Sequence, residues 1–175
     1  AQRNLVSDVP NVAALTDPNL VDPWGIAVDP NGSLWIANNR TGVSAVYDAN
    51  GSPLSAPVVI PPAAGGTLPA ALTGVVFNSS ADFVVGPNVP AQLIYATADG
   101  TIVAFNSAAR AVVKVDHSTS GASYTGLALG SSDGRNYLYA ANFNVGTIDV
   151  FDANFTPVTL AGTFFDPNLP AGFAP

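Results

Sequence analysis

The stretch WGIAV at residues 24–28 recurs twice along the chain, as TGVVF at 73–77 and TGLAL at 125–129. The glycines of the three copies are 49 residues apart (25 to 74) and then 52 residues apart (74 to 126). The copies are apolar at nearly every position, which is typical of strands in a sheet that is covered on both faces. A period of about 50 residues built around such a strand predicts a repeated β unit.

Three further β-like segments follow each copy, in the same order. The second segment carries an aromatic and a small residue, the third ends in an aromatic residue followed by Asp or Asn, and the fourth closes the unit. Unit by unit, these segments are 34–38, 46–48 and 57–60, then 94–97, 104–106 and 111–115, then 138–142, 150–152 and 158–161. Asn-Gly or Asp-Gly pairs at 31–32, 50–51, 99–100 and 133–134 favour tight turns. Four short antiparallel strands per unit predict β-propeller blades, with a β-sandwich as the competing all-β interpretation.

The repeats also predict how the chain is organised. The predicted blades are 17–61, 68–117 and 121–167, preceded by an outer or closing strand at 1–16 and followed by the start of a further unit at 168–175. Closed propellers usually have four to eight blades. About three blades therefore predict an incomplete ring, or a ring that other copies complete through its open edges.

The composition excludes several classes of protein. Of 175 residues, 48% are hydrophobic and 10% are charged, the net charge is −7, all twelve acidic residues are Asp, and there is no Cys. Few charges and many apolar residues exclude a charge-driven disordered chain. Only five Lys and Arg are scattered along the chain, so nucleic acid is not an expected partner. No apolar run approaches the ~18 residues of a membrane span.

Longer motifs resemble an uncharacterised family of secreted bacterial NHL-like β-propeller proteins, some of which carry PEP-CTERM sorting signals. The motifs are NLVSD (4–8), DPNLVDPWGIAVDPNGSLWIANN (17–39), YTGLAL (124–129), LYAANFNVGTIDVFD (138–152) and FFDPNLPAGFAP (164–175). The resemblance spans essentially the whole chain, in the family's order. It implies an NHL-like propeller, a signal peptide removed before Ala1, and a location outside the cell or at its surface. Family members are longer, so the chain resembles their amino-terminal part, and the family brings no established activity.

One histidine and no cysteine leave little room for common catalytic or zinc chemistry. His117 lies beside Asp116 at the end of a predicted outer strand. We expect His117 to be an exposed loop residue rather than a catalytic base, and we expect no zinc site within the chain.

A calcium site is excluded less firmly than a zinc site, because Asp and Asn supply the oxygen ligands that calcium prefers. The candidate ligands are Asp17, Asn19 and Asp22 in one entry loop, and Asp166 and Asn168 in its repeat. The same residue types also cap their own turns, and Asp48, Asn106 and Asp152 recur once per unit, as structural turns do. We therefore favour turn-forming roles, with no catalytic residues and no other cofactor.

Two further patterns have an ordinary explanation. Five asparagines occupy glycosylation triplets: Asn31, Asn39, Asn50, Asn78 and Asn154. Such triplets arise by chance in a chain rich in Asn, Ser and Thr, so glycosylation is a weak hypothesis. Repeat-equivalent aromatics predict blade core rather than a carbohydrate platform; they are Trp24, Trp35, Tyr47, Tyr95, Phe105, Tyr139 and Phe151.

Three functions stay open from the sequence. The favoured one is a secreted, non-catalytic structural or interaction protein that self-associates through open blade edges into a dimer or a surface polymer. The second is an extracellular propeller that binds a peptide or carbohydrate. The third is a calcium-assisted, lactonase-like hydrolase, against which the absence of Glu counts. Fold analogy does not separate them.

Overall fold

The computed structural model describes residues 2–162, 164, 168, 170, 173 and 174. These residues form short β-strands with a single 3₁₀ turn, η1 (Ser118–Ser120). No helix in the described part has the length and apolar character needed to cross a membrane. The all-β prediction is therefore confirmed.

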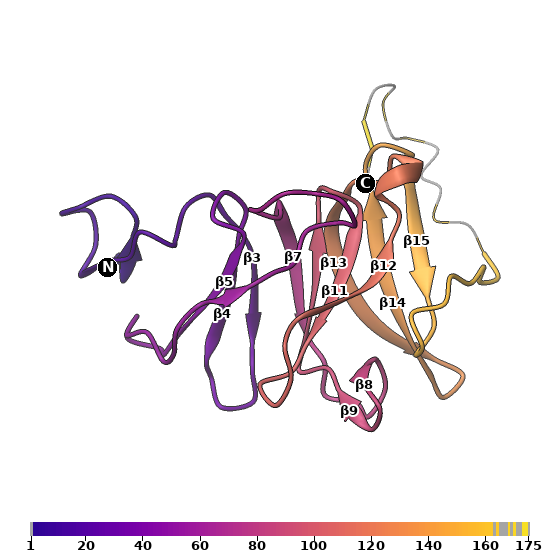
Figure 1. Ribbon diagram of the computed structural model, residues 1–175, viewed down its shortest axis with the longest axis horizontal. Coiled ribbons are helices and arrows are strands. Elements are labelled where there is room, and N and C mark those ends of the chain that lie inside the picture. The colour runs from indigo at the N-terminus through magenta and orange to yellow at the C-terminus, as the bar shows by residue number, and fades with distance from the viewer. Residues whose placement is uncertain (1, 163, 165–167, 169, 171–172, 175) are drawn as a thin grey trace.

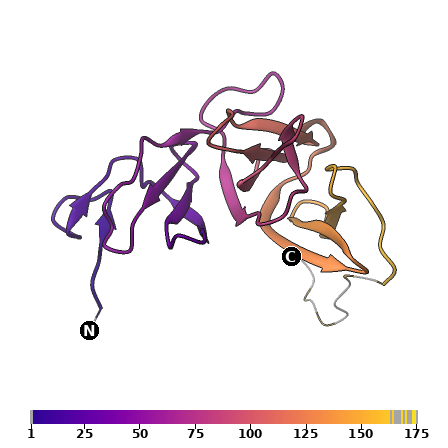
Figure 2. The ribbon, with the colours of Figure 1, turned by 90° about the horizontal axis from the view of Figure 1, so that it is seen from below.

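Three antiparallel sheets follow one another along the chain and lie side by side in an open arc (Figures 1 and 2). Blade 1 has the order β3 (Pro23–Val28), β4 (Leu34–Asn38), β5 (Val43–Tyr47) and β6 (Val58–Val59). Blade 2 has the order β7 (Leu72–Phe77), β10 (Leu93–Thr97), β11 (Thr101–Phe105) and β12 (Val112–Asp116). Blade 3 contains β13 (Tyr124–Ser132), β14 (Arg135–Asn142) and β15 (Thr147–Phe151). This succession of sheets is that of propeller blades, as predicted.

The third blade differs from the prediction, because residues 158–161 form no strand. They are tied to β15 only by the hydrogen bond from Val158 N to Val150 O (2.9 Å) and by an isolated bridge between Phe151 and Pro157. Blade 1 has the same arrangement, with a bridge between Tyr47 and Pro53 and a hydrogen bond from Leu54 N to Val46 O (3.0 Å), and there β6 follows. The predicted further unit at 168–175 lies largely outside the described residues.

Two small strand pairs lie outside the blades. Residues 1–16 were predicted to be one outer strand, but β1 (Val6–Ser7) and β2 (Leu15–Thr16) pair with each other in parallel. Between β7 and β10, the hairpin β8 (Val84–Gly86) and β9 (Val89–Pro90) is an insertion that the repeat did not predict.

The inserted hairpin reaches from blade 2 to blade 3. The Phe83 N–H donates to Ala153 O at 2.9 Å, and the rings of Phe83 and Phe155 meet edge to face at 5.4 Å. Lys114 of β12 donates to Val85 O at 3.3 Å and lies over the Phe155 ring. The hairpin therefore clasps one end of blade 3.

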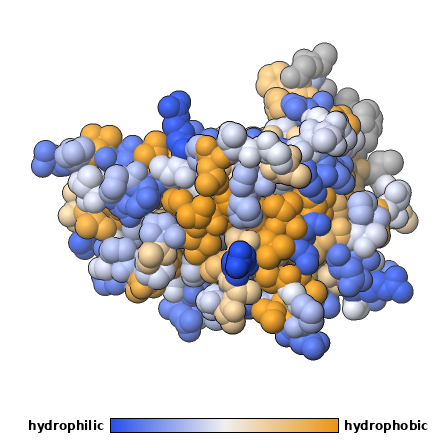
Figure 3. All heavy atoms as spheres, viewed as in Figure 1, coloured by the Kyte–Doolittle hydropathy of each residue, from blue (hydrophilic) through white to orange (hydrophobic). Residues whose placement is uncertain are grey.

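The core consists of two layers, one between each pair of neighbouring blades. Between blades 1 and 2, Ala27 and Ala37 face Val75, Leu93 and Tyr95. Between blades 2 and 3, the buried side chains include Ile94, Ile102, Tyr124, Leu138 and Phe151. On the face seen in Figure 3, apolar residues gather over the middle of the molecule and hydrophilic residues over its ends. Burial between sheets is therefore what holds the blades together.

Aspartates fix the turns that connect the strands. The carboxylate oxygen Oδ1 of Asp48 accepts the N–H groups of Asn50 and Ser52, each at 2.8 Å. Asp152 repeats the arrangement with Asn154 and Thr156, at 2.8 and 2.9 Å. The turn-forming roles expected of these residues are confirmed.

The repeated glycines let neighbouring inner strands approach backbone to backbone. A Cβ atom on Gly25 would lie 2.4 Å from Thr73 O, and one on Gly74 would lie 2.7 Å from Leu127 N. In blade 3, which has no described blade beyond it, a Cβ on Gly126 would meet only Ala141 Cβ, at 3.9 Å. The glycines that recur in the sequence repeat thus mark the contact points between blades.

We expect Gly74→Ala to lower the free energy of unfolding by about 1–3 kcal/mol, because the methyl group must push two backbones apart. Gly126→Ala is the matched control and should stay within about 0.5 kcal/mol of the wild type. Urea denaturation of dilute protein measures both values. Equal stabilities of the two variants would contradict the close approach of β7 and β13.

Candidate functional site

The most distinctive surface is the side of blade 1 that faces away from blade 2. We call it the open face of blade 1; it consists of Ile26, Val28, Leu34, Ile36 and Val59, which strand register places on one side of the sheet. Ile26, Val28 and Val59 are 60%, 57% and 58% exposed. Contiguous apolar exposure of this kind marks an interaction surface.

The same positions are covered in the other two blades. Val75, Phe77, Leu93 and Tyr95 occupy them in blade 2 and pack against blade 1. In blade 3, Leu127, Leu129, Leu138 and Ala140 pack against blade 2. The positions through which blades 2 and 3 pack against the preceding blade are thus open in blade 1 among the described residues.

In blade 3, the side of the sheet that faces away from blade 2 is the side opposite to the open face of blade 1. Ala128, Tyr139, Ala141 and Ile148 share this side by register, and we call them the open face of blade 3. Ala128 is exposed and the other three are half-buried. The ring of Tyr139 meets that of Phe164 at 5.8 Å, so a described part of the C-terminal segment lies on this face.

Trp24 does not behave as the sequence predicted. It was expected to be blade core, but it lies at a bulge at the start of β3 and is 55% exposed. Tyr47, Tyr95, Phe105 and Phe151 are buried, as expected. Trp35 and Tyr139 are half-buried. The expectation fails for Trp24 because the bulge between Pro23 and Gly25 interrupts the alternation of β3, so the repeat does not determine the side of the sheet on which Trp24 lies.

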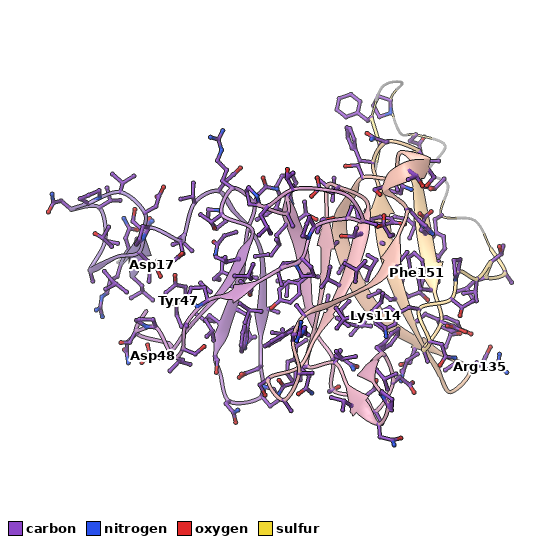
Figure 4. The ribbon with its side chains drawn as sticks, viewed as in Figure 1. Asp17, Tyr47, Asp48, Lys114, Arg135 and Phe151 are labelled. Atoms are coloured by element: carbon purple, nitrogen blue, oxygen red, sulfur yellow. The ribbon has the colours of Figure 1, made fainter. Side chains whose placement is uncertain are left out.

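The entry loop brings Asp17 and Asn19 together as a turn. Asp17 Oδ1 accepts the backbone N–H and the side-chain amide of Asn19, at 2.8 and 2.9 Å, and Asp17 Oδ2 accepts the hydroxyl of Tyr47 at 2.7 Å. Figure 4 shows Asp17 beside Tyr47, where the N-terminal segment meets blade 1. Asp22 is exposed, with a positive φ of 54°. The loop therefore fastens the N-terminal segment to β5.

The other calcium candidates are Asp166 and Asn168. Asn168 is exposed, and Asp166 lies outside the described residues. In the part of the chain that the structure describes, no three His, Cys, Asp or Glu residues form a group that could hold a metal ion. A calcium site at Asp17, Asn19 and Asp22, or at Asp166 and Asn168, stays a prediction.

The hydrogen bonds of the entry loop shift two pKa values. Burial alone would raise the pKa of Asp17, but hydrogen bonds from Asn19 and Tyr47 outweigh it and hold the pKa below its ordinary value of 3.8. Burial and the adjacent Asp17 carboxylate raise the pKa of Tyr47, which keeps its hydroxyl protonated as a donor.

The glycosylation candidates divide into two groups by accessibility. Asn31, Asn50 and Asn154 are exposed at turns. The side-chain nitrogen of Asn39 donates to Leu72 O at 2.8 Å, and that of buried Asn78 donates to Asp82 O and Ala91 O, each at 3.0 Å. A glycan on either of these two nitrogens would cost the hydrogen bonds that they make.

His117 is not the exposed loop residue that the sequence suggested. It is half-buried, its ring lies 6.0 Å from that of Phe151, and its Nδ1 is 2.8 Å from the Tyr124 hydroxyl. Nothing in the spacing of the sequence brings Tyr124 to His117, because only the turn through η1 places β13 beside the end of β12.

Comparison with known proteins defines the class of fold. Residues 20–45 match the NHL repeat. A catalytically inactive variant of virginiamycin B lyase from Staphylococcus aureus, with quinupristin, aligns with 86% of this chain and 42% of its own, at 13% identity and a TM-score of 0.59. A streptogramin B lyase structure aligns with 85% and 44%, at 18% identity and a TM-score of 0.57. The chain is therefore a β-propeller structure that carries an NHL repeat; identities this low show the fold alone.

The similar curated sequences are uncharacterised proteins of Acanthamoeba polyphaga mimivirus. Protein R648 is 32% identical over 160 residues, which is 86% of this chain and 38% of the viral protein. Protein L690 is 30% identical over 159 residues, 86% of this chain and 41% of the viral protein. The chain thus spans about two fifths of the length of these relatives.

We expect Tyr47→Phe to lower the free energy of unfolding by about 1 kcal/mol at neutral pH, because Asp17 loses its hydroxyl donor while the buried ring is kept. A carboxylate with a lowered pKa contributes stability above its ordinary pKa and loses that contribution as the pH falls through the folded-state pKa. The difference from the wild type should therefore shrink below pH 3.8, in denaturation series at several pH values. A difference that is independent of pH would argue against the hydrogen bond to Asp17.

Calcium should leave the melting temperature unchanged, because the carboxylate oxygens of Asp17 already accept hydrogen bonds within the loop. Melting curves in millimolar calcium and in excess chelator compare the two conditions. A rise in Tm with calcium that the chelator reverses would establish a calcium site instead.

Proposed function

We propose that this chain is a blade-forming interaction protein whose copies associate face to face. The open face of blade 1 in one copy packs against the open face of blade 3 in another. The observation that carries the proposal is the exposure of Ile26 and Val28 at positions that are covered in both other blades.

The two open faces complement each other as the facing sides of neighbouring blades do within the chain. Blade 1 covers the apolar side of blade 2 with small residues, Ala27 and Ala37, next to Gly25. Blade 3 offers Ala128 and Ala141 next to Gly126 at the corresponding places. A second copy therefore repeats an interface that the fold has already built twice.

The geometry of such a contact allows closure. The contact is heterologous, because two different surfaces meet, and such contacts form rings or open filaments. Two copies of three blades give six blades, within the usual range of four to eight. Low charge favours association as well, since few charged groups are desolvated. The resemblance to secreted proteins makes the cell exterior or surface the proposed location of the assembly.

We expect Ile26→Asp to weaken association by at least about tenfold, because it buries a charge in the contact. Ile26 is largely exposed within one copy, so folding should be kept. Leu54→Asp is the matched control: Leu54 is 54% exposed in the loop after β5, off the open face, and its replacement should leave association unchanged. Light scattering over a concentration series reports the particle mass, and circular dichroism confirms the fold.

Gly126→Ala tests the other side of the contact. The methyl group meets only Ala141 within the copy, but it would obstruct a blade that approached as closely as Gly74 approaches blade 3. Association should fall while stability is kept. A wild-type particle of 17.7 kDa at all concentrations, or association insensitive to both Ile26→Asp and Gly126→Ala, would overturn the proposal. An intact chain heavier than 17.7 kDa by mass spectrometry would also overturn it, because further blades of the same chain could then cover both faces.

A further inference from the structure

A chain of hydrogen bonds links three side chains of blades 2 and 3. The distance from His117 Nδ1 to the Tyr124 hydroxyl oxygen is 2.8 Å, and that hydroxyl donates to Asp149 Oδ2 at 3.0 Å. Asp149 also accepts the amide of Asn142 at 2.9 Å and the hydroxyl of Thr147 at 3.1 Å. Four separate segments thus hold one carboxylate, one phenol and the only imidazole of the protein in a fixed order.

The order of donors and acceptors fixes the tautomer of His117. An ionised carboxylate only accepts hydrogen bonds, so the Tyr124 proton lies toward Asp149. The Tyr124 oxygen then accepts, and His117 Nδ1 must carry the hydrogen. Burial and the charge of Asp149 raise the pKa of fully buried Tyr124, so the phenol keeps its proton. In the neutral ring, Nε2 is left with a lone pair, and it bonds to no described residue.

His117 and Asp149 line a cavity of about 410 Å³ beside β15, which is the edge strand of blade 3 among the described residues. Most of the remaining wall is apolar and comes from β15 and residues 157–160; it includes Ile148, Phe151 and Leu160. The volume is within the range of small-molecule sites. Two lining residues, His117 and Asp149, offer hydrogen-bond acceptors, namely the Nε2 lone pair and the carboxylate.

We propose that this cavity is a binding site for a small aromatic molecule that carries a hydrogen-bond donor, of the phenol class. The aromatic body fills the apolar part of the cavity and its hydroxyl donates to His117 Nε2. Tyr124 and Asp149 are positioning residues, because they hold the imidazole with Nε2 as the acceptor. The lining of the site comes from a single copy and shares Ile148 with the open face of blade 3, and its test reads the His117 ring rather than the particle mass.

The single histidine makes the test direct. Nitrogen chemical shifts of ¹⁵N-labelled protein report the tautomer of His117 alone. While the imidazole ring of the wild-type protein is neutral, Nδ1 should be protonated and Nε2 should be unprotonated. Titration with p-cresol should move the ring signals of His117. Toluene has the same ring and methyl group without the hydroxyl, and should bind about fivefold to tenfold more weakly.

Two variants separate positioning from packing. Tyr124→Phe keeps the ring but removes the hydroxyl, so the Nδ1–H tautomer should lose its dominance and the preference for p-cresol over toluene should fall to about twofold or less. Tyr47→Phe, in blade 1 and outside the cavity, is the control and should change neither the tautomer nor this preference.

Either of two results on the wild-type protein would overturn the site, even if Tyr124→Phe failed to fold. One is a neutral His117 protonated at Nε2. The other is equal binding of p-cresol and toluene, or no shift of the His117 signals with either probe.

Discussion

Contact between the backbones of neighbouring inner strands sets the spacing of the whole molecule. Sheets that pack through side chains lie about 10 Å apart. At Gly25 and Gly74 no side chain stands between the strands, and a single added carbon would collide with the next blade. The inner edges can therefore converge while bulkier residues hold the outer strands apart, and this wedge shape turns a row of sheets into an arc (Figure 2).

The aspartates of the chain support this arrangement as hydrogen-bond acceptors. Asp48 and Asp152 take up the amides of their own turns, Asp17 holds a phenol of blade 1, and Asp149 holds one of blade 3. A short carboxylate suits these tasks because it reaches amides two and four residues further along the chain. The preference for Asp over Glu follows from where the acids work: in tight turns and at strand ends, rather than on helix surfaces.

Most of the fold could be predicted because its signals are local and repeated. The glycines, the turn dipeptides and the aromatic-Asx pairs each act within a few residues, so their spacing reveals the blades. The hairpin β8–β9 breaks the period and has no counterpart in the other units from which to predict it, whereas the bridge at Pro157 repeats the bridge at Pro53 of blade 1. The exposure of Trp24 depends on a bulge, which hydrophobic pattern does not show. The contact of His117 with Tyr124 depends on how two blades meet, and the open faces are recognised only once the covered ones are seen.

The contact between the inserted hairpin and blade 3 affects how the protein unfolds. Phe83 and Phe155 extend the core layer that blades 2 and 3 share, so separating these two blades requires the hairpin contact and the rest of that layer to open together. Among the described residues, no inserted hairpin joins blade 1 to blade 2. Cooperative units of a repeat protein follow the strength of each junction. Blades 2 and 3 are therefore expected to unfold as one unit, through a larger junction than the core layer that joins blade 1 to blade 2.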